Sequence, residues 1–161
     1  MERLHLSWEG LLALVRRLAE ALREEEFDLI LGIARGGLIP TALLAQALSV
    51  RDILTAAVMF YEGEETLPEP VFLQFPPDPL LFGKRVLVVD DVWDSGRTAL
   101  AVKERVRQAG GVPLVATLLE NSAAALVNVA QAFLLTRTEP KRLGTAHPQI
   151  VPYQAFLPPM D

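Results

Sequence analysis

The sequence has no cysteine, no apolar run long enough to cross a bilayer and no tract of basic residues. Without cysteine, the chain can form neither disulfides nor thiolate metal sites, which is typical of a cytoplasmic protein. Without about 18 consecutive apolar residues it has no transmembrane helix, and Glu and Arg interrupt the apolar positions where a signal peptide would lie. The net charge of −5 argues against a nucleic-acid-binding surface. The composition therefore predicts no membrane and no nucleic-acid partner.

The residues that are present suit one folded domain. The chain has 161 residues, of which 51% are hydrophobic, enough for a sizeable core. We expect a single domain over residues 1–161 with its core at about 7–136. Ser7 is a good N-cap for a helix starting at Trp8, and apolar residues follow at helical spacing. These residues are Leu11, Val15, Leu18 and Leu22.

Strand and helix patterns alternate along the chain. Strands are expected at 27–33, 53–61, 86–89, 113–119 and 132–136, with helices after the first and third; the alanine-rich stretch 122–131 fits either a helix or a connection. This order predicts an α/β fold with a central, mostly parallel sheet flanked by helices. Residues 62–83 are acidic and proline-rich, with a short strand possible at 71–75, and fit either a functional lid or a solvated insertion.

One stretch combines acids with a loop suited to anions. Val86 to Val89 have the pattern of a strand buried on both faces. Asp90 and Asp91 follow at its carboxyl end, where ligands bind in open α/β sheets. The next residues lead into a helix, and such a loop offers backbone N–H groups to an anion. These loop residues are Asp94, Ser95, Gly96, Arg97 and Thr98. The combination suits a phosphorylated sugar.

A second candidate anion site follows the first strand. Arg35 has a planar donor fork that suits phosphate oxygens, and Gly36 and Gly37 let the backbone approach a ligand closely. A helix with Pro40 in its first turn comes next. Alone, a tight turn with a solvated arginine would explain this pattern better. A second anion loop in the same sheet favours the binding interpretation.

These two stretches resemble a known family. The run from Val86 to Thr98 is similar to the signature of the type I phosphoribosyltransferases, and Arg35-Gly36-Gly37 is similar to the first loop of the xanthine-guanine and hypoxanthine members. The resemblance implies transfer of the 5-phosphoribosyl group from phosphoribosyl pyrophosphate (PRPP) to a nitrogenous base, in particular a purine, with Mg²⁺ as cofactor. It also implies a lid at 62–83, a small irregular hood at 137–161 and a homodimer.

The resemblance also implies roles for individual residues. Asp90 and Asp91 would hold the ribose hydroxyls and the metal. Asp94 would act as general base, with helix capping as its alternative, and it completes the catalytic set of Asp90, Asp91 and Asp94. The 5′-phosphate would be bound by residues 94–98, in which Arg97 either adds a charge or faces solvent: Asp94, Ser95, Gly96, Arg97 and Thr98. The pyrophosphate would be bound by a loop that often contains a cis non-proline peptide: Arg35, Gly36 and Gly37.

The base side departs from the family pattern. The purine enzymes carry a lysine at the end of the strand after the signature helix, whereas this strand ends Leu118-Leu119-Glu120-Asn121. Aligning the hood on Pro152-Tyr153 puts Pro148 at the stacking position and Gln154 in place of an acid. The candidates for base contact are Val151, Tyr153 and His147.

Two other interpretations explain part of the pattern. The altered base site favours, to some extent, a PRPP-binding regulatory protein of the same fold with reduced catalysis. A phosphoacceptor receiver domain has a similar Val-Leu-Val-Val-Asp-Asp strand. It would carry that pair near its start, however, and would have no use for Ser95 to Thr98, so this interpretation ranks low.

Overall fold

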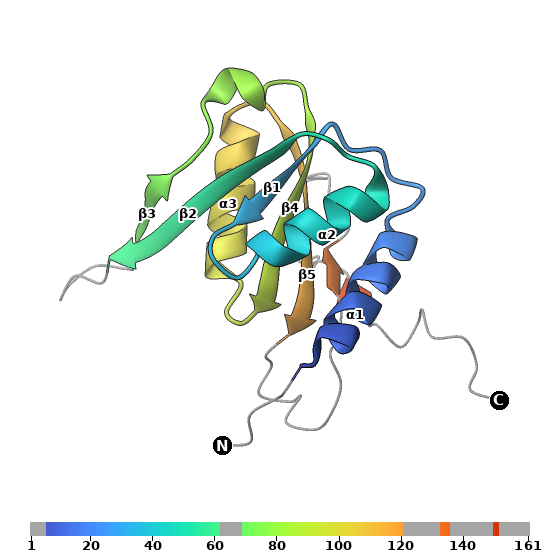
Figure 1. The fold of residues 1–161 in the computed structure, drawn as a ribbon. Coiled ribbons are helices and arrows are strands. Elements are labelled where there is room, and N and C mark those ends of the chain that lie inside the picture. Colours follow the sequence, from blue (N-terminus) through green and yellow to red (C-terminus); the bar gives the residue numbers. More distant parts are fainter. Residues whose placement is uncertain (1–5, 62–68, 121–132, 136–149, 152–161) are drawn as a thin grey trace.

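The computed structural model describes residues 6–61, 69–120, 133–135 and 150–151 (Figure 1). The helices are α1 (Trp8–Ala21), α2 (Leu38–Leu48), α3 (Arg97–Gln108) and the short 3₁₀ helix η1 (Asp78–Leu80). The strands are β1 (Leu29–Ile33), β2 (Ile53–Tyr61), β3 (Glu69–Gln74), β4 (Arg85–Trp93), β5 (Val112–Glu120), β6 (Phe133–Leu135) and β7 (Ile150–Val151). Within these ranges, no helix is both long and apolar enough to cross a membrane.

The seven strands form one sheet in the order β3-β2-β1-β4-β5-β6-β7. Its centre, β2-β1-β4-β5, is parallel, whereas β3, β6 and β7 pair antiparallel. The predicted α/β fold with a mostly parallel sheet is confirmed. The alanine-rich stretch 122–131 lies outside the described residues, as does the predicted hood at 137–161 apart from residues 150–151.

Helices cover both faces of the sheet, so two cores form. Leu87 and Val89 of β4 pack on the side of α1 and α2, whereas Val86 and Val88 pack on the side of α3. All four are fully buried, which explains why this strand has no polar alternation. The predicted start of α1 is confirmed, since the Ser7 Oγ accepts the Gly10 N–H at 3.0 Å.

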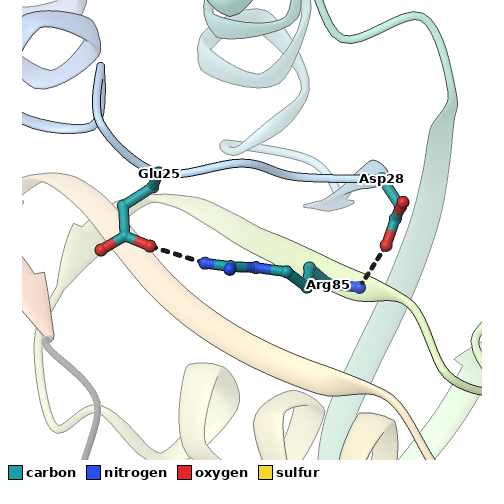
Figure 2. A network of polar contacts seen from close by, with 3 residues as sticks. All are labelled: Glu25, Asp28 and Arg85. Atoms are coloured by element: carbon teal, nitrogen blue, oxygen red, sulfur yellow. Dashed lines mark hydrogen bonds and ion pairs between the residues drawn. The ribbon is translucent and has the colours of Figure 1, made fainter.

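A polar network fixes the amino-terminal ends of β1 and β4 (Figure 2). The Arg85 N–H donates to the Asp28 Oδ2 at 2.7 Å, and the Asp28 N–H donates back to the Arg85 carbonyl at 2.9 Å. The Arg85 guanidinium donates to Glu25 at 2.7 Å. Strand β1 therefore begins at Leu29 and not at residue 27. The network sets the β1–β4 register, which brings the carboxyl ends of both strands to one edge of the sheet.

The described part of the predicted lid has regular structure. Strand β3 pairs with β2, and η1 is tied to α3 by an Arg105–Asp78 ion pair at 2.5 Å. The role of 62–83 as a lid stays a prediction, and the short strand expected at 71–75 corresponds to β3. Residues 62–68 lie outside the described residues.

Candidate active site

The acidic pair lies within the last part of β4, which continues to Trp93. Strand alternation directs Asp90 to the α3 side, with Val86 and Val88, and directs Asp91 to the α2 side. There the Asp91 carboxylate lies so close to Gly36 that a Cβ atom at residue 36 would overlap it. The structure thus brings the acidic pair of β4 against the glycine loop of β1, as the sequence predicts for a shared site.

Backbone groups orient both carboxylates. The Asp91 N–H donates to the Asp90 Oδ1 at 2.9 Å, and the Val92 N–H donates to the Asp91 Oδ1 at 2.8 Å. Each side chain is half-buried. Burial raises the pKa of Asp90 from 3.8 to about 7, the hydrogen bond from the Asp91 N–H opposes this shift, and the charge of Asp91 adds to it.

This raised pKa predicts a pH-dependent stability of the ligand-free, metal-free protein. Between about pH 4 and 7 the folded protein keeps a proton on Asp90 that the unfolded chain releases. The free energy of unfolding should therefore fall as the pH rises through this window, by at most about 1.4 kcal/mol per pH unit from one proton. Thermal unfolding of the wild type and Asp90→Asn from pH 5 to 8 measures the difference. Identical slopes would contradict the assignment.

The loop between β1 and α2 contains the predicted pyrophosphate-binding residues. Its Ala34–Arg35 peptide bond is cis, as the family resemblance implies, and Arg35 and Gly36 are exposed. Gly37 is instead buried, and its N–H donates to the Ile33 carbonyl at 2.9 Å. A Cβ atom at residue 37 would lie 2.5 Å from the Val89 carbonyl oxygen. Gly37 thus allows α2 to start close against β1 and β4, whereas Arg35 and Gly36 are exposed, and their pyrophosphate role stays a prediction.

The loop between β4 and α3 contains the predicted 5′-phosphate site. Gly96 has φ +75° and lies against the Trp93 ring, where any side chain would overlap the indole. Helix α3 starts at the next residue without a side-chain cap, so its first N–H groups can meet an anion. The Ser95 Oγ accepts the Arg97 N–H at 3.4 Å. The Arg97 guanidinium lies over Phe60, with Cζ 4.6 Å from the ring centroid.

The remaining predicted residues have different outcomes. Asp94 is exposed and Thr98 half-buried at the start of α3, which suits ligand contact, and the general-base role of Asp94 stays a prediction. Val151 lies in β7, opposite Leu134 of β6. His147 and Tyr153 lie outside the described residues, so the base contacts also stay predictions. Strand β5 ends at Glu120, in agreement with the strand end read from the sequence.

Two aromatic residues contact the predicted phosphate loop, residues 94–98. The sequence predicts Trp93 as a packing or lid contact, and its ring lies against Gly96. Phe60 lies under Arg97 and is not predicted, because an aromatic residue in an apolar strand has the same pattern as an ordinary core residue. Only the pairing of β2 with its neighbours shows that Phe60 reaches Arg97. No local sequence signal could have identified it.

The donor set fits a metal that takes few protein ligands. Among the described residues, no cluster of three or more His, Cys, Asp or Glu could hold an ion. Asp90 and Asp91 offer carboxylate oxygens beside a loop suited to phosphate. Mg²⁺ is commonly held by one or two carboxylates together with waters and substrate phosphates, so the pair fits this ion.

Comparisons with known proteins agree with this geometry. The sequence matches the Phosphoribosyl transferase domain family over residues 6–147. It is 39% identical over 111 residues to a xanthine-guanine phosphoribosyltransferase of Chromohalobacter salexigens, covering 69% of this chain and 66% of that relative.

Solved structures are also similar to this chain. A purine phosphoribosyltransferase from Pyrococcus horikoshii has a TM-score of 0.67 at 36% identity, over 79% of this chain and 84% of its own. A Neisseria gonorrhoeae protein with bound ppGpp has a TM-score of 0.65 at 26% identity, over 76% and 74%. With the sheet order, the two loops and the acidic pair all in place, the chain belongs to the phosphoribosyltransferase domain family.

Proposed function

We propose that this protein is a Mg²⁺-dependent phosphoribosyltransferase that transfers the 5-phosphoribosyl group of PRPP to a purine base and releases pyrophosphate. The observation that carries the proposal is the contact between the Asp91 carboxylate and Gly36, because it brings the elements proposed to bind the ribose and the pyrophosphate into one site. The names of the similar purine enzymes support the substrate class. The absence of cysteine favours action in the cytoplasm.

Each element has a role in this reaction. The bond from the anomeric carbon to pyrophosphate breaks as a bond to a base nitrogen forms, and positive charge develops on the ribose. Asp90 and Asp91 stabilise this charge and hold the ribose hydroxyls. Residues 95–98 hold the 5′-phosphate, and Arg35 with Gly36 holds the leaving pyrophosphate. Asp94 accepts the proton of the base nitrogen.

Mg²⁺, held by Asp90 and Asp91, would supply positive charge to neutralise the pyrophosphate oxygens.

Calorimetric titration tests the function directly. We expect PRPP with Mg²⁺ to bind, and we expect one or more bases from a panel of xanthine, guanine, hypoxanthine and adenine to yield nucleotide and pyrophosphate. Arg35→Ala should weaken the binding of PRPP more than the binding of ribose 5-phosphate, because only PRPP carries the pyrophosphate. No binding of PRPP would refute the proposal. Binding without turnover on any base would support the regulatory alternative, which the missing lysine at the end of β5 favours.

We propose further that the protein forms a homodimer through the outer face of α2 and the adjoining surface of β2 and β3. Helix α2 has no charged residue, and Ile39 is 54% exposed at its start. Leu73 of β3 is 66% exposed. In a chain of net charge −5, an uncharged helix is one that a second copy can approach without like-charge repulsion. Homodimers are also what the family resemblance implies.

The proposed interface predicts that a single substitution halves the molecular mass in solution. Ile39→Glu would place two like charges near each other across a two-fold contact and should convert the dimer to a monomer in light scattering. Leu80→Glu adds the same charge at a residue of similar exposure, 49%, on η1 and should leave the dimer intact. A monomeric wild type, or dissociation by both variants alike, would contradict this interface.

A further inference from the structure

Two arginines of α3 each cover an aromatic ring of the neighbouring β2–β3 region. The Arg97 Cζ lies 4.6 Å from the centroid of the Phe60 ring, and the Arg105 Cζ lies 4.8 Å from that of Phe75. Phe60 is near the carboxyl end of β2, and Phe75 directly follows β3. The two contacts are therefore chemically alike but lie about 12 Å apart along the helix, at 1.5 Å per residue.

Only the first contact involves the phosphate loop. Arg97 is the first residue of α3, and the N-cap before it is Gly96, which has no side chain to hold the helix start. The contacts that hold this turn include the Trp93 ring against Gly96, the Ser95 hydroxyl and the Phe60 ring against Arg97. Phe60 lies in β2, whereas the loop follows β4, so this contact links the loop to a different strand.

The second contact serves as an internal reference. Arg105 is in the last turn of α3 and also pairs with Asp78 of η1 at 2.5 Å. Phe75 packs edge-on against Phe72, with ring centroids 5.3 Å apart. This cluster joins the same helix to the same part of the sheet, but it lies away from the phosphate loop. Its loss should affect stability without affecting the loop.

We propose that Phe60 is a positioning residue for the 5′-phosphate: by stacking under Arg97 it fixes the backbone N–H groups at the start of α3, without touching the ligand. This inference rests on the proposed function, because it assigns the loop to the 5′-phosphate. The guanidinium stacked on Phe60 orders the first turn, and the phosphate is bound by the N–H groups and hydroxyls of that turn.

Phe60→Leu tests the proposal, since leucine keeps the apolar bulk and loses the ring. We expect the Kd of ribose 5-phosphate and the KM for PRPP to rise about two- to fivefold, the factor that corresponds to a cation–π contact at an exposed site. The kcat should stay within about twofold, because the 5′-phosphate is held equally before and during transfer. Phe60→Trp, which keeps an aromatic face under Arg97, should restore wild-type affinity.

Phe75→Leu is the matched control, and it should leave the Kd of ribose 5-phosphate at the wild-type value. Arg97→Lys keeps the charge and loses the planar stack, so it should reproduce the effect of Phe60→Leu, and the double variant should be no weaker than either single variant. If Phe60→Leu fails to fold, Arg97→Lys alone carries the test, and an unchanged Kd of ribose 5-phosphate in that variant would then overturn the proposal.

Three results would overturn the proposal: equal effects of Phe60→Leu and Phe75→Leu, no rescue by Phe60→Trp, or additive effects in the double variant. A wild type that binds neither ribose 5-phosphate nor PRPP would instead refute the proposed function, and this inference with it.

Discussion

Replacing Asp90 and Asp91 together by asparagine should lower kcat for nucleotide formation by at least about two to three orders of magnitude, the scale expected when a charge-stabilising group is removed. Asparagine keeps the size of each side chain and an oxygen that can accept the N–H groups of Asp91 and Val92. The change therefore removes negative charge beside the ribose and leaves the fold in place. Initial rates with saturating PRPP and the best base of the panel measure the effect.

The melting temperature of this variant shows whether a loss of activity comes from unfolding. Since Asp90 has a raised pKa, an amide at this position should leave the melting temperature at pH 8 unchanged or higher than that of the wild type. A folded double variant with near-normal kcat would refute the role of the pair. A variant that unfolds would show that the pair is needed for folding, and single substitutions would then separate the two acids.

Gly36→Ala should reduce activity strongly although it alters no charged group. The added methyl group would overlap the Asp91 carboxylate, so either this side chain or the glycine loop must move. A displacement of about 1 Å in a catalytic group can cost on the order of 100-fold in rate. We expect a loss of this size in kcat/KM for PRPP, measured by steady-state kinetics.

A double substitution isolates the overlap as the cause. In an Asp91→Ala background the methyl group at residue 36 meets no carboxylate, so Gly36→Ala should then cost little further stability or PRPP affinity. Gly10→Ala offers a comparison on α1, where the nearest atom to the new Cβ is the flexible end of Leu6 at 3.0 Å, and it should leave kcat/KM unchanged. Equal losses of PRPP affinity from Gly36→Ala in the wild-type and Asp91→Ala backgrounds would show that Asp91 is not involved.

The parts of the fold that were predictable from sequence are those with a local pattern. Ser7 marks the start of α1, four apolar residues mark the centre of β4, and Pro40 lies in the first turn of α2. The acidic pair and both loops were found because strand ends, glycines and charged residues occur together there. Their convergence followed from the parallel order of β1 and β4, which brings their carboxyl ends to one edge.

Other features depend on contacts between distant segments, which a single sequence does not contain. The prolines of 62–83 favoured a loop, yet Pro70 lies in β3, an edge strand where a missing N–H is tolerated. The adjacent glycines were assigned to one purpose, whereas Gly37 packs against backbone and Gly36 faces Asp91. Phe60 acquires its role only through the position of Arg97 in space.

The different surroundings of these two glycines give a way to interpret other members of the family. At residue 37 the space is closed by carbonyl oxygens of Ile33 and Val89, which no side-chain substitution can move. A descendant that abandoned catalysis would still need glycine there for α2 to close on the sheet. At residue 36 the obstacle is the Asp91 side chain, which evolution can replace. A family member with a bulkier residue at 36 and no acidic residue at 91 would therefore be expected to have the same fold but no transferase activity.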